Sequence, residues 1–171
     1  MKMRKLFSWK QEPNSEKGSV LLNVAQQFLY LSYPKGISPR KLQKLTFYAQ
    51  SLHLVLYNTP LFDEDFEAWV HGPISPDLYY HFKKYGTQKI PSIERPALIE
   101  EKAFKATQII WKIYGHHSGK YLERKAFYEE AFQISRKGIP YYESFNEIIP
   151  KELMKSTFSK RVRIIREEVI D

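Results

Sequence analysis

The chain of 171 residues contains no cysteine, which excludes disulfides, thiolate metal sites and cysteine nucleophiles. Its seven glycines form no phosphate-binding loop, and no serine lies in a GxSxG motif. No apolar run approaches the ~20 residues of a membrane-spanning helix. The basic segment Met1–Lys10 is not followed by the apolar stretch of a signal peptide. These absences predict a cytoplasmic protein that has no membrane partner and is not an enzyme.

Acidic side chains are the scarcer charged class, with 19 Asp and Glu against 27 Lys and Arg, so the net charge is +8. The basic residues are spread over residues 1–17, 83–89 and 160–166 and are interrupted by other types. A nucleic-acid partner is therefore the less favoured alternative, since a dedicated surface would gather its cations. Four acidic residues do lie close together, and we call them the acidic patch: Asp63, Glu64, Asp65 and Glu67.

The best-marked element is a helix over residues 38–57. Ser38 suits the N-cap, and Pro39 suits the first helical position, where its missing N–H costs nothing. Asn58 tolerates the left-handed conformation that ends many helices. Between these ends, apolar residues recur at steps of three and four: Leu42, Leu45, Ala49, Leu52 and Leu56. The pattern predicts a central amphipathic helix with Leu45, Ala49 and Leu52 buried.

The remaining pattern predicts a mainly α fold, a single compact helical domain. Helices are expected at residues 19–33, 77–85, 97–114, 118–132, 134–137 and 150–158, and a short strand or small β-hairpin around residues 61–72. The predicted organisation is a mobile basic N-terminal arm (1–17), one domain (18–158) and a charged C-terminal tail (159–171). No linker is long enough to divide the chain further.

The five histidines invite a metal site, but their spacing argues against one. Zinc and iron sites usually take at least three ligands from short segments. His116 and His117 are adjacent and would point apart on a regular element, while His53 lies within the predicted central helix. The acidic patch lacks the spacing of a calcium loop. We therefore predict no metal, no cofactor and no catalytic residue.

The segment WVHGPISPDLYYHF, residues 69–82, has the features of a docking surface. It combines a tryptophan, a Gly-Pro turn and a second Ser-Pro helix start. Aromatic side chains dominate interface energetics, and a rigid turn loses little entropy on binding. The predicted partner-binding residues are Trp69, His71, Pro73, Ile74, Asp77 and Tyr80. We expect His71, Ile74, Asp77 and Tyr80 to face outward, beside an open helix start, and the acidic patch to steer a basic partner.

Several motifs in this order resemble the Panacea domain family. They are KLQKLTFYAQ (Lys41–Gln50), PLFDEDFEAW (Pro60–Trp69), HGPI (His71–Ile74) and PDLYYHF (Pro76–Phe82). A second similar stretch, residues 113–138, shares Glu129 and the Arg-Lys-Gly that ends at Gly138. It departs from the family at Ala126-Phe127, in place of Thr-His, and at Ala131-Phe132, in place of Pro-Trp. Phe127 and Phe132 are expected to preserve packing.

The resemblance implies an antitoxin of a bacterial or prophage toxin–antitoxin system. Such a protein neutralises a cytoplasmic protein toxin by direct binding, and its partner is the cognate toxin, encoded by a neighbouring gene. Two alternatives stay open on the residues alone. One is a nucleic-acid-binding regulator that uses the basic surface, and the other, less favoured, is a metal-dependent enzyme.

Overall fold

The structure of the protein, a computed structural model, describes residues 19–169, with side chains placed through residue 162. The predicted basic arm at residues 1–17 lies outside the described residues. The described part contains seven α-helices, a two-stranded antiparallel sheet and one 3₁₀ turn. They are α1 (Val20–Leu31), α2 (Pro39–Tyr57), β1 (Glu67–Trp69), β2 (Gly72–Ile74), α3 (Pro76–Phe82), the 3₁₀ turn Lys83–Tyr85, α4 (Glu101–Tyr114), α5 (Gly119–Phe127), α6 (Glu130–Arg136) and α7 (Lys151–Val169). The predicted mainly α fold is confirmed.

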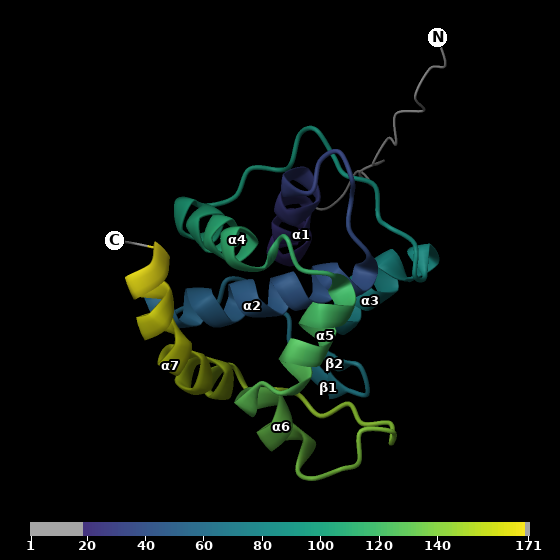
Figure 1. The fold of residues 1–171 in the computed structure, drawn as a ribbon, viewed down its shortest axis with the longest axis vertical. Helices are drawn as coiled ribbons and strands as arrows, with labels where there is room; N and C mark the ends of the chain where they lie inside the picture. The colour runs from purple at the N-terminus through teal and green to yellow at the C-terminus, as the bar shows by residue number, and fades with distance from the viewer. Residues whose placement is uncertain (1–18, 170–171) are drawn as a thin grey trace.

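Helix α2 runs through the middle of the molecule, and the other elements pack around it (Figure 1). Helices α1 and α4 lie on one side of it, α5 crosses it, and α7 passes along another side. Every residue of α2 from Leu42 to Leu54 is buried, the polar ones included. Leu45 and Ala49 are 0% exposed and Leu52 1%, which confirms the predicted core positions. Because α2 is covered on all sides, its polar side chains must find partners inside the protein.

Both ends of α2 form as its sequence predicts. The Ser38 hydroxyl accepts a hydrogen bond from the Lys41 backbone N–H at 3.2 Å, which satisfies one of the free amides of the first turn. Asn58 ends the helix in the left-handed conformation, with φ 57°. The start and stop of the central helix are therefore set by local chemistry.

Other helix limits also differ from prediction, and the segment expected at residues 134–137 is the end of a longer helix, α6, which begins at Glu130 and ends at Arg136. Helix α4 begins at Glu101 rather than at residue 97. The helix expected over residues 118–132 is two helices, because Glu129 is extended (φ −66°, ψ 134°) between α5 and α6. No glycine or proline marks this break. The Glu129 side chain is buried and hydrogen-bonded to Tyr48 of α2, so a contact distant in sequence decides where the helix stops.

Helix α7 extends well beyond the short helix predicted for residues 150–158. It continues without a break to Val169, across the start of the predicted charged tail. Met154, Phe158 and Val162 lie four residues apart and are all buried in the core, at 1%, 3% and 4% exposure. Since Val162 continues the apolar stripe of the first turns, the helix and its packing extend past residue 158.

The predicted hairpin is present but lies later in the chain. Strands β1 and β2 cover residues 67–74 rather than 61–72, with Ala68 opposite Pro73 and Trp69 opposite Gly72. Residues 61–66 have no regular structure, yet they place Leu61, Phe62 and Phe66 in the core. No helix in the described part of the chain is long and apolar enough to cross a membrane.

Candidate functional site

The hairpin and the start of α3 are held by two adjacent side chains of α2. Gln43 Nε2 donates to the Ser75 carbonyl at 2.9 Å, and the Ser75 N–H donates to Gln43 Oε1 at 2.9 Å. Lys44 Nζ donates to the Pro73 carbonyl at 2.8 Å. Gln43 is 5% exposed and Lys44 0%. Buried backbone groups need partners, and here α2 side chains provide them in place of a third strand.

Gln50, two turns along α2, holds the preceding irregular segment in the same way. Its Nε2 donates to the Phe62 carbonyl at 2.8 Å, and its Oε1 accepts from the Leu61 N–H at 2.7 Å. Gln43 and Gln50 therefore each form hydrogen bonds with one backbone carbonyl and one backbone N–H of segments that lie outside helices and strands. Side chains of the segment KLQKLTFYAQ thus hold the backbone of the segment PLFDEDFEAWVHGPIS.

The far side of the hairpin is held by Arg136, which is 3% exposed at the end of α6. Its Nη1 donates to the Ala68 carbonyl of β1 at 2.9 Å. Its Nη2 donates to the carbonyls of Pro140 and Glu143, at 2.7 and 2.9 Å. A planar guanidinium with five donors is suited to such a carbonyl cluster. The hairpin is consequently clamped from both sides.

Burial changes the pKa of the Lys44 amine. Loss of hydration lowers the pKa of Lys44 to about 7. The negative charge of Glu123 opposes this shift, and the positive charge of Arg40 adds to it. The hydrogen bond to Pro73 does not require a charged amine, because a neutral amine still donates. Gly72 leaves space for this side chain: it has φ +91°, and a Cβ there would lie 3.3 Å from Lys44 Nζ.

The predicted partner-binding residues fall into two groups. His71, Asp77 and Tyr80 are exposed, with Tyr80 at 63%, as expected. Pro73 is buried, and Ile74 is only 8% exposed, so the prediction that Ile74 faces outward is wrong. Every residue of β2 is buried, because α2 and α5 both pack against this strand.

Trp69 is half-buried and belongs to an aromatic row. Its Nε1 donates to Glu67 Oε2 at 2.6 Å, and its ring meets Tyr79 edge-on, with centroids 5.1 Å apart. Tyr79 in turn meets the ring of Tyr80 at 5.4 Å. Tyr79 is 43% exposed, so the row presents aromatic area to solvent. We call the surface formed by Trp69, His71, Asp77, Tyr79 and Tyr80 the docking face.

The helix start at this face is closed rather than open. Ser75 Oγ accepts from the Leu78 N–H at 3.4 Å, Pro76 occupies the first helical position, and the Ser75 backbone is held by Gln43. The prediction of an open helix start is therefore wrong. What the Ser-Pro sequence provides here is rigidity at the turn.

A pocket of about 220 Å³ opens beside the docking face. It lies between the first turns of α2, strand β2, α3 and α5. Its lining residues are Pro39, Arg40, Leu42, Gln43, His71, Ile74, Leu78, Tyr79, Phe82, Lys83, Gly86 and Glu123. Buried apolar side chains form much of the wall, since Leu42 and Leu78 are 1% exposed and Phe82 3%.

The charged groups of the pocket are unevenly paired. Arg40 Nε lies 2.8 Å from Glu123 Oε2, although that oxygen receives no hydrogen bond. His71 Nδ1 lies 3.8 Å from the other oxygen of Glu123. Lys83 lies over the ring of Tyr80, 5.1 Å from its centroid, and has no ion-pair partner among residues 19–162. Cations therefore exceed carboxylates at this pocket.

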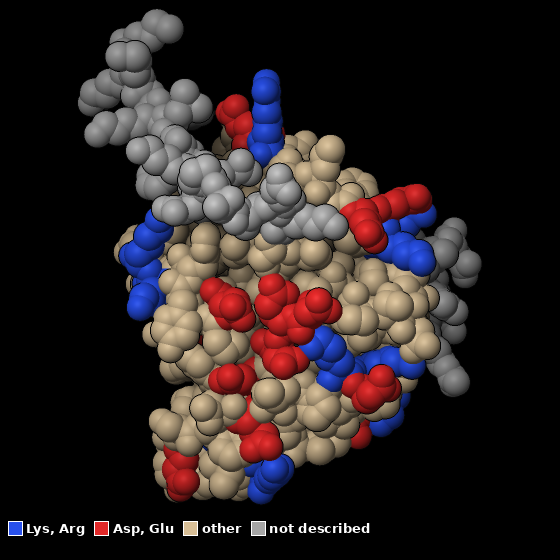
Figure 2. Space-filling view, turned by 180° about the vertical axis from the view of Figure 1, so that it is seen from behind, with Lys and Arg blue, Asp and Glu red and all other residues tan. Residues whose placement is uncertain are grey.

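The acidic patch is largely engaged within the protein. Glu64 Oε1 accepts from the Ser19 hydroxyl at 2.6 Å, and Asp65 Oδ1 pairs with Lys151 Nζ at 2.5 Å. Glu67 receives the Trp69 indole N–H. Figure 2 shows acidic side chains gathered near the middle of the back of the molecule, next to basic ones. The steering role predicted for this patch stays a prediction, and Asp63 is its most exposed member.

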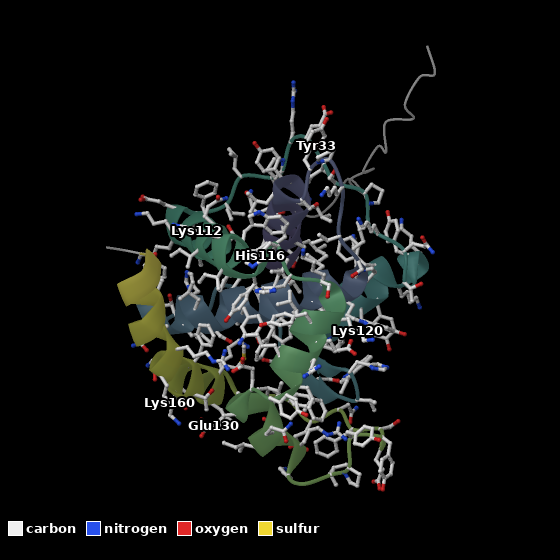
Figure 3. All side chains as sticks on the ribbon, in the orientation of Figure 1. Tyr33, Lys112, His116, Lys120, Glu130 and Lys160 are labelled. Atoms are coloured by element: carbon white, nitrogen blue, oxygen red, sulfur yellow. The ribbon has the colours of Figure 1, made fainter. Side chains whose placement is uncertain are left out.

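The histidines lie in separate surroundings. His53 Nδ1 is 2.7 Å from the Thr59 carbonyl, and burial lowers the pKa of His53. The ring of His117 stacks on that of Tyr121, with centroids 4.1 Å apart, and the ring of His116 lies tilted against His117, with centroids 4.0 Å apart. Figure 3 places His116 in the connection that follows α4, away from the hairpin. Within residues 19–162, no three His, Asp or Glu side chains are grouped as metal ligands would be.

The second similar stretch provides packing and one buried polar network. Phe132 is 0% exposed and its ring lies 5.3 Å from that of Phe127, which confirms their predicted packing role. Glu129 Oε1 accepts from the Tyr48 hydroxyl at 2.9 Å and lies 3.0 Å from Arg161 Nη2 of α7. Burial raises the pKa of Glu129, and Arg161 opposes this effect. This network joins α2, α6 and α7.

Sequence reasoning missed the residues that position the site: Gln43, Lys44, Gln50 and Arg136. It also missed Arg40, Tyr79, Lys83 and Glu123 at the pocket. One indication was available, because Gln43 and Lys44 are adjacent polar residues between Leu42 and Leu45, two predicted apolar positions of the helix. Two adjacent polar residues on a helix point in different directions, so their burial follows only if the helix is covered all round.

One of three comparisons with known proteins gives a match. Neither the curated proteins nor the solved structures with which the chain was compared gave a match. A family model, antitoxin SocA-like, Panacea domain, matches residues 42–133. The matched part begins in the α2 segment that holds the hairpin and includes the hairpin, α3 and most of the pocket wall. The chain therefore belongs to the antitoxin SocA-like, Panacea domain family.

Proposed function

We propose that the protein is an antitoxin that neutralises a cytoplasmic protein toxin by direct binding. The family of the chain supports an antitoxin role in general terms. The observation that carries direct binding is the docking face itself, in which the exposed rings of Tyr79 and Tyr80 lie on α3, directly after a segment held by buried hydrogen bonds at Pro73 and Ser75. A surface fixed before binding loses little conformational entropy in the complex. We expect the toxin to be encoded by a neighbouring gene, in a bacterial chromosome or a prophage.

The docking face has the composition of a protein interface rather than of a catalytic centre. Tyr and Trp are enriched among the residues that contribute most binding energy, and Tyr80 and Tyr79 are 63% and 43% exposed. Lys44, the titratable side chain buried beneath the hairpin, is 0% exposed, so a substrate could not reach its amine. Its hydrogen bond to Pro73 gives it a structural role.

Co-expression with the product of the adjacent gene tests this proposal. The wild-type protein should restore growth of cells that produce the toxin and should co-purify with it. Asp77→Arg and Tyr80→Ala should weaken both effects, because both side chains are exposed on the docking face. Matched controls are Glu101→Arg, also an exposed acid in the first turn of a helix, and Tyr128→Ala, 71% exposed.

The same assay can also show that the toxin binds outside the docking face. Folded Asp77→Arg and Tyr80→Ala proteins that neutralise normally would show that the docking face is wrong. If Lys160→Glu abolished protection in the same assay, the interaction would belong to α7. Truncation after Phe158 is a poor test of that helix. It would remove Val162 from the core and Arg161 from its pair with Glu129.

A further inference from the structure

The pocket beside the docking face has the size of a single side chain. Its volume is about 220 Å³, whereas sites for drug-sized ligands and cofactors span roughly 300–1,000 Å³. Its wall is formed largely by Leu42, Leu78 and Phe82, with Ile74 at the edge of the hairpin. These four side chains are already almost fully buried, so an aromatic or leucine side chain that enters would contact them at the floor and would remove its own apolar surface, and that of Pro39 and Tyr79 at the rim, from water.

The charges of the pocket indicate what should flank that side chain. Arg40 and Lys83 line it, against the single carboxylate of Glu123. Glu123 already lies against Arg40, which leaves Lys83 with only the Tyr80 ring and no carboxylate among the described side chains. A partner that brings its own carboxylate would complement this excess of positive charge.

The walls of the pocket are already fixed. Gln43 holds the Ser75 backbone through two hydrogen bonds, and Lys44 holds the Pro73 carbonyl on the other side of Ile74. Tyr79 at the rim is supported by the ring of Trp69. Anchor side chains that contribute most to binding typically fill such well-packed, water-excluding pockets.

We propose that this pocket receives one phenylalanine or leucine side chain of the toxin, from a segment that carries an adjacent carboxylate, which pairs with Lys83. This inference rests on the proposed function, since it names the part of the toxin that the docking face recognises. It differs from the expectation of a basic toxin, because three members of the acidic patch are engaged within the protein, whereas Lys83 at the pocket has no carboxylate partner among the described side chains.

Short peptides test the pocket without the toxin. The probes are acetyl-Gly-Glu-Phe-Glu-Gly-amide, the same peptide with both Glu changed to Lys, and the acidic peptide with Phe changed to Ala. Each is titrated into the full chain labelled with nitrogen-15. The acidic phenylalanine peptide should shift the backbone amide signals of Ile74, Leu78 and Lys83. The basic peptide and the alanine peptide should shift them less at the same concentration.

Two variants separate charge from shape. Lys83→Glu should weaken binding of the acidic phenylalanine peptide roughly threefold or more, and should favour the basic peptide instead. Lys112→Glu, an exposed lysine on α4 that Figure 3 shows away from α3, is the matched control and should bind as the wild type does. Ile74→Phe should reduce binding of both peptides by filling the pocket. Lys83→Glu keeps the proposal testable if Ile74→Phe does not fold.

The outcomes distinguish this inference from the proposed function. Equal binding of acidic and basic peptides, or signals that shift elsewhere on the protein, would overturn the pocket assignment even if the toxin is neutralised. Peptide binding at the pocket with no neutralisation of any neighbouring toxin would uphold the pocket and refute the antitoxin role. In the toxin complex, normal neutralisation by folded Lys83→Glu and Ile74→Phe would also overturn the assignment.

Discussion

Replacing Lys44 by methionine should change how the stability of the protein depends on pH. Lys44 is 0% exposed, and burial lowers its pKa to about 7 from the ordinary 10.5. Between these two values the unfolded chain holds a proton on Lys44 that the folded protein has released. Stability rises with pH wherever the unfolded state binds more protons. The wild-type protein should therefore gain stability as the pH increases from 7 towards 10.5.

The size of the effect follows from the two pKa values. Well between pH 7 and pH 10.5, each pH unit raises the free energy of unfolding by about 1.4 kcal/mol. Near pH 7 the Lys44 amine of the folded protein is still partly protonated. The free energy of unfolding therefore rises by about 2 kcal/mol from pH 7 to pH 9. Below pH 6 both states carry the proton and Lys44 contributes almost no further change. Domains of this kind have a total stability of about 5–15 kcal/mol, so the difference is measurable.

Urea unfolding of wild type and Lys44→Met at pH 7, 8 and 9, followed by circular dichroism, measures this effect. Other titrating groups are common to both proteins and cancel in the difference. The difference in free energy of unfolding should change by about 2 kcal/mol in favour of the wild type from pH 7 to pH 9. For Lys112→Met, at an exposed position, the difference in free energy of unfolding from the wild type should stay constant with pH. If the Lys44→Met difference is also constant with pH, Lys44 titrates normally and its burial does not govern its charge.

Three further substitutions test the packing. Leu45→Ala, at a position 0% exposed, should lower the free energy of unfolding by about 2–5 kcal/mol in urea titration, and a loss below 1 kcal/mol would contradict its place in the core. Gly36→Ala should lower the melting temperature much more than Gly86→Ala. Both have positive φ, but a Cβ at Gly36 would lie 2.2 Å from the Ile90 carbonyl oxygen, whereas one at Gly86 meets nothing within 4 Å. Arg161→Met should cost about 1–3 kcal/mol, measured in the same way, because Glu129 is left buried without its cation; a neutral effect would show that the network does not hold α7.

The sequence alone determined the features that depend on neighbouring residues. Ser38, Pro39 and Asn58 set the limits of α2 because capping and the left-handed turn act within one helical turn. The spacing of Leu45, Ala49 and Leu52 identified the core face for the same reason. The ordered motifs also indicated the family, which the match to residues 42–133 shows.

Only the tertiary structure decided the features that join distant segments. The break before α6 depends on Glu129 reaching Tyr48, 81 residues earlier in the chain, so no local pattern could reveal it. Ile74 is buried because α2 and α5 converge on β2, although its own turn predicts an exposed residue. The polar pair Gln43 and Lys44 becomes a clamp only when the hairpin lies against α2. Local propensity fixes where elements begin and end, whereas packing between elements decides which polar groups must be paired and where a pocket is left.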